Sequence, residues 1–223
     1  MNIAKNVALF GGTFDPVHSG HLAAARAAQA AFSLDQIHFV PARIPPHKPS
    51  RRLTAFPHRH AMVALACAGI PSFVPSILES RGEQQGEPNY SILTVRRMAA
   101  QLAPGDRLFF LIGADAFLEI GAWKEPVALL DATDFIIVSR PGFAITRAAQ
   151  VIPAELQPAA MTEHCIQLRR TRVHLLTTVE ADISSSSIRE LALQNKPLRD
   201  MVPAAVEEYI QKLSLYQHED QAE

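Results

Sequence analysis

The chain has 223 residues, enough for one well-buried domain and too few for two ordinary ones. Its hydrophobic content of 48% excludes an intrinsically disordered protein. Its formal net charge of −1 gives no bulk electrostatic attraction to nucleic acid or to a membrane surface, so we expect neither as a partner and expect local groups to hold any phosphate ligand.

Apolar runs alternate with helical patterns along the chain. The strands expected are 7–10, 37–41, 73–78, 108–112, 135–139 and 173–177. The helices expected are 21–32, 57–68, 91–102, 114–118, 126–130, 186–194 and 204–213. Strands without polar interruption indicate burial on both faces, so the sequence predicts a Rossmann-like, doubly wound α/β fold: a parallel sheet with helices on both faces. We expect a single domain over residues 1–216 and a polar tail at 217–223.

Two segments interrupt the alternation. Residues 42–57 form a basic, proline-rich loop, and residues 141–172 are irregular, with a weak helical pattern at 146–151. Cys67 and Cys165 fit no metal or redox spacing and are expected to be buried thiols. A strand pattern begins almost at once, with no secretory leader before it and no run of membrane-spanning length after it, so we expect a cytoplasmic protein.

The end of the first expected strand carries paired glycines, an Asp-Pro step and two histidines, all before a helical pattern. A strand that ends at glycines and continues as a helix presents free backbone N–H groups and the positive end of the helix dipole, and both favour an anion. His18 and His21 are three positions apart at the helix start, so both rings point to the same side. We interpret this segment as a nucleoside triphosphate site.

Two other interpretations fit the same residues. Paired glycines followed by Asp-Pro are ordinary turn chemistry on a surface loop. Histidines three apart can share a metal ion, but protein metal sites take three or four ligands and Asp15 alone is a poor third, so we predict no protein metal site. Neither of the two common glycine-rich nucleotide loops occurs in the sequence.

The run from Gly11 to His21, GGTFDPVHSGH, resembles the signature of the nucleotidylyltransferase superfamily, and its fuller wording is similar to that of the bacterial nicotinate-nucleotide adenylyltransferases. The resemblance implies transfer of AMP from ATP to nicotinate mononucleotide, which gives nicotinate adenine dinucleotide and pyrophosphate in NAD biosynthesis. It implies catalytic roles for both histidines, and it assigns ATP contacts to six residues of the motif: Gly11, Gly12, Thr13, Phe14, His18 and His21.

A serine-rich string, residues 183–189, follows the last expected strand and opens a helix. Serine is a preferred N-cap residue, so capping alone would explain the string. Its hydroxyls, free amides and arginine are also suited to phosphate oxygens. The string resembles the family's Ile-Ser-Ser-Thr-x-Ile-Arg motif, which implies ATP contacts for Ser185, Ser186 and Arg189 and a catalytic role for Arg189.

The proline-rich loop contains Pro45-Pro46-His47-Lys48, which resembles a loop of the same family that reaches toward the phosphates. The resemblance implies a catalytic and substrate-binding role for Lys48, with Arg43 and Arg51 as weaker candidates. A solvated cluster of charges is the alternative interpretation of this loop.

Further stretches resemble the family's substrate contacts, among them residues 89–94, which are similar to the family's Ser-Tyr-Thr-x-x-Thr start of a helix. Gly113-Ala114-Asp115 and Arg140-Pro141-Gly142 each follow an expected strand, which implies ATP contacts for Gly113, Asp115 and Arg140. Helix capping by Asp115 and simple packing by the only tryptophan, Trp123, are the alternative interpretations. The resemblance implies a nicotinate mononucleotide site made by Lys48, Tyr90, Ser91, Asp115 and Trp123.

The reaction implied is attack of the substrate's 5′-phosphate on the α-phosphorus of ATP in line, without a covalent enzyme intermediate. The nucleophile is already an anion, so catalysis would come from positioning and from stabilisation of phosphate charge. Mg²⁺ is expected to arrive with ATP. The alternatives are a superfamily transferase for nicotinamide mononucleotide, phosphopantetheine or a cytidine nucleotide, a non-catalytic nucleotide sensor, and a metal-dependent hydrolase; a homo-oligomer is compatible with the sequence.

Overall fold

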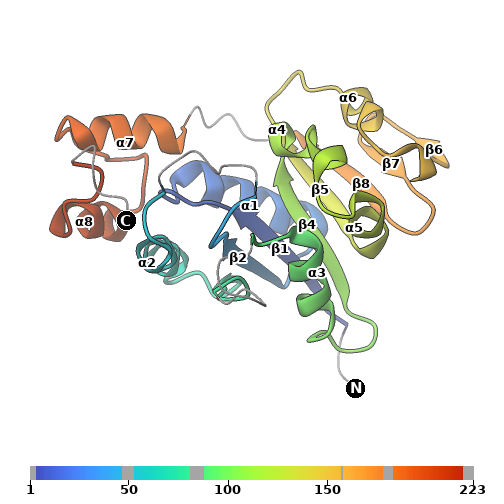
Figure 1. Cartoon of the computed structure of the whole chain (residues 1–223), viewed down its shortest axis with the longest axis horizontal. Helices are drawn as coiled ribbons and strands as arrows, with labels where there is room; N and C mark the ends of the chain where they lie inside the picture. Colours follow the sequence, from blue (N-terminus) through green and yellow to red (C-terminus); the bar gives the residue numbers. More distant parts are fainter. Residues whose placement is uncertain (1–3, 47–52, 81–87, 157, 178–182, 218–223) are drawn as a thin grey trace. The chain divides into compact units, whose positions relative to one another are not determined.

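The computed structural model describes residues 4–46, 53–80, 88–156, 158–177 and 183–217, in which strands and helices alternate along the chain (Figure 1). The strands are β1 (Asn6–Gly12), β2 (Gln36–Pro41), β3 (Phe73–Pro75), β4 (Arg107–Gly113), β5 (Asp134–Ser139), β6 (Ala160–Met161), β7 (Cys165–Gln167) and β8 (Arg172–Thr177). The helices are α1 (Ser19–Phe32), α2 (Phe56–Cys67), α3 (Ser91–Ala99), α4 (Ala114–Phe117), α5 (Pro126–Ala132), α6 (Ile145–Gln150), α7 (Ser185–Leu193) and α8 (Ala204–Lys212).

The strands lie in the order β3-β2-β1-β4-β5-β8-β7-β6. β1 pairs with β4, β4 with β5 and β5 with β8, all in parallel. The strand order reverses between β1 and β4, which is where doubly wound folds bind their ligands, beyond the carboxyl ends of the strands. The predicted doubly wound α/β fold is confirmed, with one addition: β7 runs antiparallel to β8 and to β6.

The chain divides into two compact units that interleave in sequence. Unit 1 comprises Met1–Gly11, Ala24–His38 and Tyr90–Glu180, and unit 2 comprises Gly12–Ala23, Phe39–Asn89 and Ala181–Glu223. The single domain expected over residues 1–216 stays a prediction.

Unit 1 is built on the strands predicted to be apolar throughout. Leu9, Phe109, Leu111 and Ile136, from β1, β4 and β5, are each at most 1% exposed, as burial on both faces of a parallel sheet requires. The irregular stretch after β5 contains α6, β6 and β7. α6 packs against β7, but the strands have only two and three residues, too few for a periodic sequence pattern.

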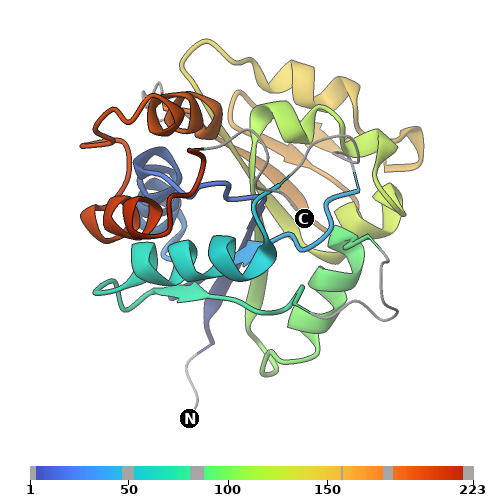
Figure 2. The same cartoon turned by 60° about the vertical axis from the view of Figure 1, so that its left-hand side comes forward.

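Unit 2 carries α2, α7 and α8. α8 packs on α2 (Figures 1 and 2). Between these two helices, the side chains of His58 and Tyr209 share a 2.9 Å hydrogen bond. The strand predicted at 73–78 was too long: β3 ends at Pro75, because the Ser76 hydroxyl accepts the backbone N–H of Leu78 at 3.2 Å and turns the chain.

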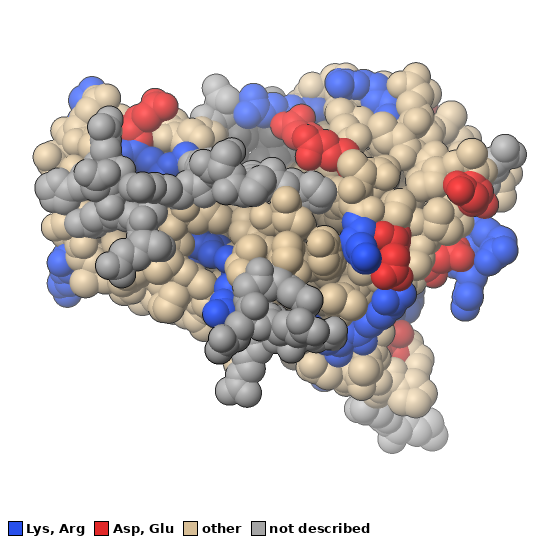
Figure 3. All heavy atoms as spheres, in the orientation of Figure 1, with Lys and Arg blue, Asp and Glu red and all other residues tan. Residues whose placement is uncertain are grey.

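Charge is mixed on the surface. On the face drawn in Figure 3, basic and acidic side chains both occur and neither sign covers it, in keeping with the formal net charge of −1. None of the helices in the described ranges is both long enough and apolar enough to cross a membrane.

Candidate nucleotide site

The segment between β1 and α1 belongs to unit 2 and is fixed by packing. A side chain at Gly12 would come within 3.1 Å of the Phe14 ring, so only glycine fits there without displacing that ring. Phe14 has a φ of 48°, in the left-handed region, and is 1% exposed. The carbonyl of His18 then accepts the N–H groups of His21 and Leu22, which starts α1. The chain therefore leaves β1 along a single path and delivers both histidines to the helix start.

The two histidines lie against each other. Their ring centroids are 3.7 Å apart at an interplanar angle of 32°. The backbone N–H of His18 donates to Nδ1 of His21 at 3.2 Å, so the proton of the neutral His21 ring lies on Nε2. Burial lowers the pKa of His18 to about 4, and burial followed by the nearby His18 lowers the pKa of His21 well below its usual range. Both rings are therefore neutral N–H donors at pH 7 in the free protein.

The serine-rich string separates into capping serines and others. The Ser184 hydroxyl accepts the backbone N–H of Ser187 at 3.1 Å, and the Ser187 hydroxyl accepts the N–H of Ser184 at 3.3 Å, which is a capping box. Ser185 and Ser186 take no part in that box. The capping interpretation thus holds for Ser184 and Ser187 and does not account for the two predicted phosphate contacts, Ser185 and Ser186.

Two of the predicted phosphate-binding motifs meet in unit 2. The Ser185 hydroxyl donates to the carbonyl of Pro16 at 3.0 Å. Arg189 donates through Nη1 to the carbonyl of Asp15 at 2.6 Å and through Nη2 to the Ser186 hydroxyl at 3.0 Å. Residues more than 160 positions apart in sequence are therefore in direct contact, with the histidines only a few residues farther along the same segment.

A buried arginine that the sequence analysis did not single out holds this region together. Arg59 of α2 is 1% exposed and donates four hydrogen bonds of 2.7–3.3 Å to backbone carbonyls. Their acceptors belong to Thr13, Ala42, Arg43 and Thr54. One guanidinium thus ties the phosphate motif to both ends of the basic loop.

A sequence signal for Arg59 did exist. Arg59, Met62, Val63 and Ala66 follow the spacing of one helix face, and all four are buried. A lone arginine on an otherwise apolar stripe requires buried acceptors, because an unpartnered charge in a core is costly.

The basic loop itself is only partly described. Lys48 and Arg51 lie outside the described residues, so their predicted roles stay predictions. Arg43 donates to the carbonyl of Ser80 at 3.0 Å, so its guanidinium is engaged at the exposed surface.

In unit 1, the predicted ATP contacts lie at strand ends. Gly113 ends β4, and Asp115 lies in the first turn of α4. Arg140 directly follows β5, and the β4–β5 register pairs Gly113 with Val138. The three predicted residues therefore share the carboxyl edge of this part of the sheet.

Three of the five predicted nicotinate mononucleotide contacts, Tyr90, Ser91 and Trp123, lie on neighbouring segments of unit 1. Tyr90 and Ser91 stand at the start of α3, and Nζ of Lys124 lies 5.7 Å from the centroid of the Tyr90 ring. The neighbouring Trp123 packs edge-on against Phe110 with ring centroids 6.4 Å apart. The turn that carries Trp123 is thus held beside the start of α3, while the tryptophan also serves in packing.

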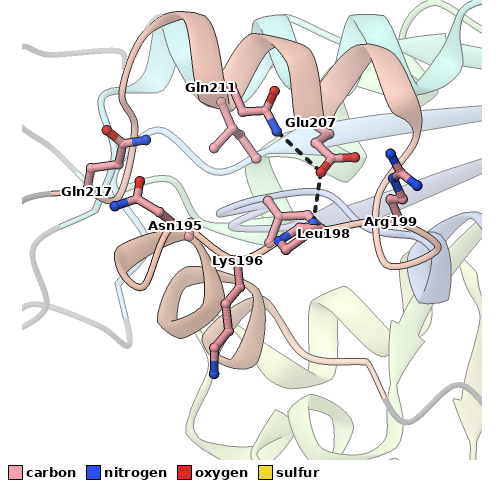
Figure 4. A pocket seen from close by; sticks show the side chains of 10 residues that line it. Asn195, Lys196, Leu198, Arg199, Glu207, Gln211 and Gln217 are labelled. Atoms are coloured by element: carbon pink, nitrogen blue, oxygen red, sulfur yellow. Dashed lines mark hydrogen bonds between the residues drawn. The ribbon is translucent and has the colours of Figure 1, made fainter.

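A pocket on α7 and α8 contains none of the predicted site residues (Figure 4). Its rim includes Lys196 and Arg199, and Glu207 accepts the N–H of Leu198 at 2.8 Å. In the ranges that the structure describes, no three His, Cys, Asp or Glu side chains are grouped so that they could hold a metal ion.

Comparison with known proteins gives a consistent result. A family model described as cytidylyltransferase-like matches residues 9–191. A protein of Geobacter metallireducens named "Probable nicotinate-nucleotide adenylyltransferase" is 40% identical over 216 residues, which cover 95% of this chain and 98% of its own. A Moorella thermoacetica protein of the same name is 39% identical over 210 residues, covering 94% of this chain and 91% of its own.

Solved structures with the same fold include the Plasmodium falciparum nicotinic acid mononucleotide adenylyltransferase complexed with NaAD. It matches with a TM-score of 0.71 at 21% identity and covers 96% of this chain and 98% of its own. The same protein complexed with APC matches with a TM-score of 0.70. At this identity the likeness concerns the fold.

Proposed function

The chain belongs to the cytidylyltransferase-like family and, within it, to the nicotinate-nucleotide adenylyltransferases, and from that membership we propose that it transfers AMP from ATP to nicotinate mononucleotide. The products are nicotinate adenine dinucleotide and pyrophosphate, and the reaction belongs to NAD synthesis. The Geobacter and Moorella relatives carry this activity in their names.

One observation carries the assignment of the site: the contact between the segment Asp15–Pro16 and the pair Ser185 and Arg189. Polyphosphate binding needs several donors at one place, and two motifs far apart in sequence meet here. His18 and His21 follow on the same segment, which supports their assignment to the phosphates.

In the proposed mechanism, a 5′-phosphate oxygen of nicotinate mononucleotide forms a bond to the α-phosphorus of ATP. The bond from that phosphorus to the oxygen bridging it to the β-phosphorus breaks, and pyrophosphate leaves with the electron pair. Neutral His18 and His21 donate N–H groups to phosphate oxygens, while Ser185, Ser186 and Arg189 hold the pyrophosphate end, together with Lys48. The protein thus positions the reactants and stabilises charge, and supplies no nucleophile.

Mg²⁺ enters this proposal as a companion of ATP. Carried in on the phosphates, it would supply charge neutralisation for the leaving pyrophosphate. The nearest candidate ligands, His18 and His21, do not suit a magnesium ion of this chain's own, because Mg²⁺ prefers oxygen ligands and Nδ1 of His21 already accepts a backbone N–H. The cytoplasmic location and a homo-oligomer stay predictions.

The pyridine end of the substrate is proposed to lie at Tyr90, Ser91 and Trp123, with Asp115 and Arg140 on the nucleotide side. Backbone amides and the Ser91 hydroxyl at the start of α3 suit a carboxylate, the group that separates nicotinate from nicotinamide. Stacking on an aromatic ring suits the pyridine.

A paired substrate assay tests the proposed function. The protein is incubated with ATP and Mg²⁺ and with either nicotinate or nicotinamide mononucleotide, and the dinucleotide product is identified by mass. Faster turnover with nicotinate mononucleotide is the expected result. A preference for the nicotinamide form would contradict the carboxylate site, and release of no pyrophosphate with either substrate would leave a nucleotide sensor as the better reading.

A further inference from the structure

A buried carboxylate in the phosphate-binding segment has partners from three distant parts of the chain. Asp15 is 2% exposed. Its Oδ1 accepts a 2.7 Å hydrogen bond from the hydroxyl of Tyr216, and its Oδ2 accepts the backbone N–H of Thr54 at 3.3 Å. Its backbone carbonyl accepts the guanidinium of Arg189 at 2.6 Å. All three oxygens of the residue are thus engaged, and a buried carboxyl group would be costly without such partners.

Tyr216 reaches Asp15 along a backbone path that is unfavourable by itself. The chain leaves α8 through Ser214 at a φ of 51°, where the N–H of Leu215 bonds back to the carbonyl of Ile210 at 3.0 Å. Tyr216 follows at a φ of 66°. A left-handed conformation costs a non-glycine residue about 1 kcal/mol, so contacts beyond the turn must maintain it. The burial of Leu215 and the hydroxyl bond of Tyr216 are such contacts.

The hydroxyl of Tyr216 stays protonated and therefore remains a hydrogen-bond donor. Burial raises the pKa of Tyr216 well above its usual value, and the charge of Asp15 raises it further. The phenol therefore keeps its proton throughout the range in which the protein works. A donor of this kind fixes the direction of the carboxylate that it meets.

We propose that Tyr216 is a positioning residue for adenylyl transfer: its hydroxyl fixes Asp15, and Asp15 in turn sets the place of the Arg189 guanidinium. The inference rests on the proposed function, since Arg189 is assigned there to the ATP phosphates. Tyr216 itself touches no reacting group and acts through the Asp15 carbonyl. Misplacement of a site group by about 1 Å can cost about 100-fold in rate; with Thr54 still holding Asp15, we expect about tenfold.

The chain offers a matched control for this inference. Tyr209 lies in the same unit, and its hydroxyl forms a hydrogen bond with Nδ1 of His58 between α8 and α2. Tyr216→Phe and Tyr209→Phe therefore each remove one hydroxyl that makes a hydrogen bond inside unit 2. A purely structural role predicts the same consequences for both variants.

The experiment compares wild type, Tyr216→Phe and Tyr209→Phe. The measurements are kcat/KM for ATP, KM for nicotinate mononucleotide, Kd for ATP by calorimetry, and Tm. We expect Tyr216→Phe to lose about tenfold in kcat/KM and in affinity for ATP, with an unchanged KM for nicotinate mononucleotide and a Tm close to that of Tyr209→Phe. Equal values of kcat/KM and Kd for ATP in the two variants would overturn the inference.

Failure of the proposed function gives a different result. If the wild type forms no dinucleotide, the activity assignment is wrong, while the calorimetric Kd for ATP in the same three proteins still tests Tyr216. Equal Kd values would then reject its positioning role, and weaker binding by Tyr216→Phe alone would support it.

Discussion

The predicted phosphate contacts in unit 2 and the predicted pyridine contacts in unit 1 differ in how firmly they are held. In unit 2, Asp15, Arg59 and Arg189 each make hydrogen bonds of 2.6–3.3 Å within or next to the phosphate-binding segment. Asp15 and Arg59 are at most 2% exposed. In unit 1, the predicted pyridine contacts Tyr90, Ser91 and Trp123 are each half-buried. The difference suggests that changes on the phosphate side alter rate and stability together, whereas changes on the pyridine side alter substrate affinity.

The largest effect on stability is expected for Arg59→Met. The substitution removes four hydrogen bonds made by a buried guanidinium and leaves partly buried carbonyls without donors, so the free energy of unfolding should fall by about 3–5 kcal/mol. Urea unfolding measures it, with the exposed Arg199→Met as a control expected to lie within about 0.5 kcal/mol of wild type. Equal stability of the two variants would refute the anchoring role of Arg59.

The largest effect on rate is expected for His21→Ala. Loss of one preorganised donor costs about 2.7–4 kcal/mol of transition-state stabilisation, so kcat should fall by about 10²–10³. His58→Ala is the control: it removes a histidine of the same unit that bonds to Tyr209 outside the candidate site. Near-wild-type turnover in His21→Ala would reject its assignment.

Acid should weaken the fold through the histidine pair. A histidine can have a lower pKa in the folded than in the unfolded protein. Its contribution to stability is then fully present at a pH above the unfolded pKa and is lost as the pH falls toward the folded pKa. For His18 the window runs from 6.5 down to about 4, worth about 3 kcal/mol at most, and His21 shifts in the same direction. His18→Asn should flatten the pH dependence of unfolding, whereas exposed His164→Asn should not; an unchanged slope in His18→Asn would contradict the account.

The smallest effect is expected on the pyridine side. Ser91→Ala removes one hydroxyl at the start of α3, so KM for nicotinate mononucleotide should rise about tenfold, near the lower end of what one hydrogen bond to a charged group contributes. KM for ATP and Tm should stay close to wild type. A change in KM for ATP with none for nicotinate mononucleotide would show that Ser91 belongs to the other substrate.

Much of the fold could be predicted because its signals are local. Apolar strands such as β4 and β5, and the helix start after Gly12, are recorded in short stretches of sequence, and the observed bounds lie within a few residues of those predicted. β6 and β7 could not be predicted, since strands of two and three residues depend on pairing with each other and with β8 and leave no pattern of their own.

The candidate site divides in the same way. The local structure around His18, Ser185 and Arg189 could be predicted, because each of the two motifs that contain them marks the start of a helix. The groups that hold those motifs were missed: Asp15 was weighed only as a metal ligand, and Tyr216 was taken as the last residue before a polar tail. The hydrogen bond between Tyr216 and Asp15 joins residues 201 positions apart, and no local sequence pattern indicates such a contact.

The central claim is that the histidine segment and the start of α7 act on the same ATP phosphates. A double-mutant cycle on kcat/KM for ATP, with His21→Ala, Arg189→Met and the double variant, tests it most directly. We predict a coupling energy of at least about 1 kcal/mol, with the double variant losing clearly less than the sum of the single losses. Losses that add fully would contradict the claim.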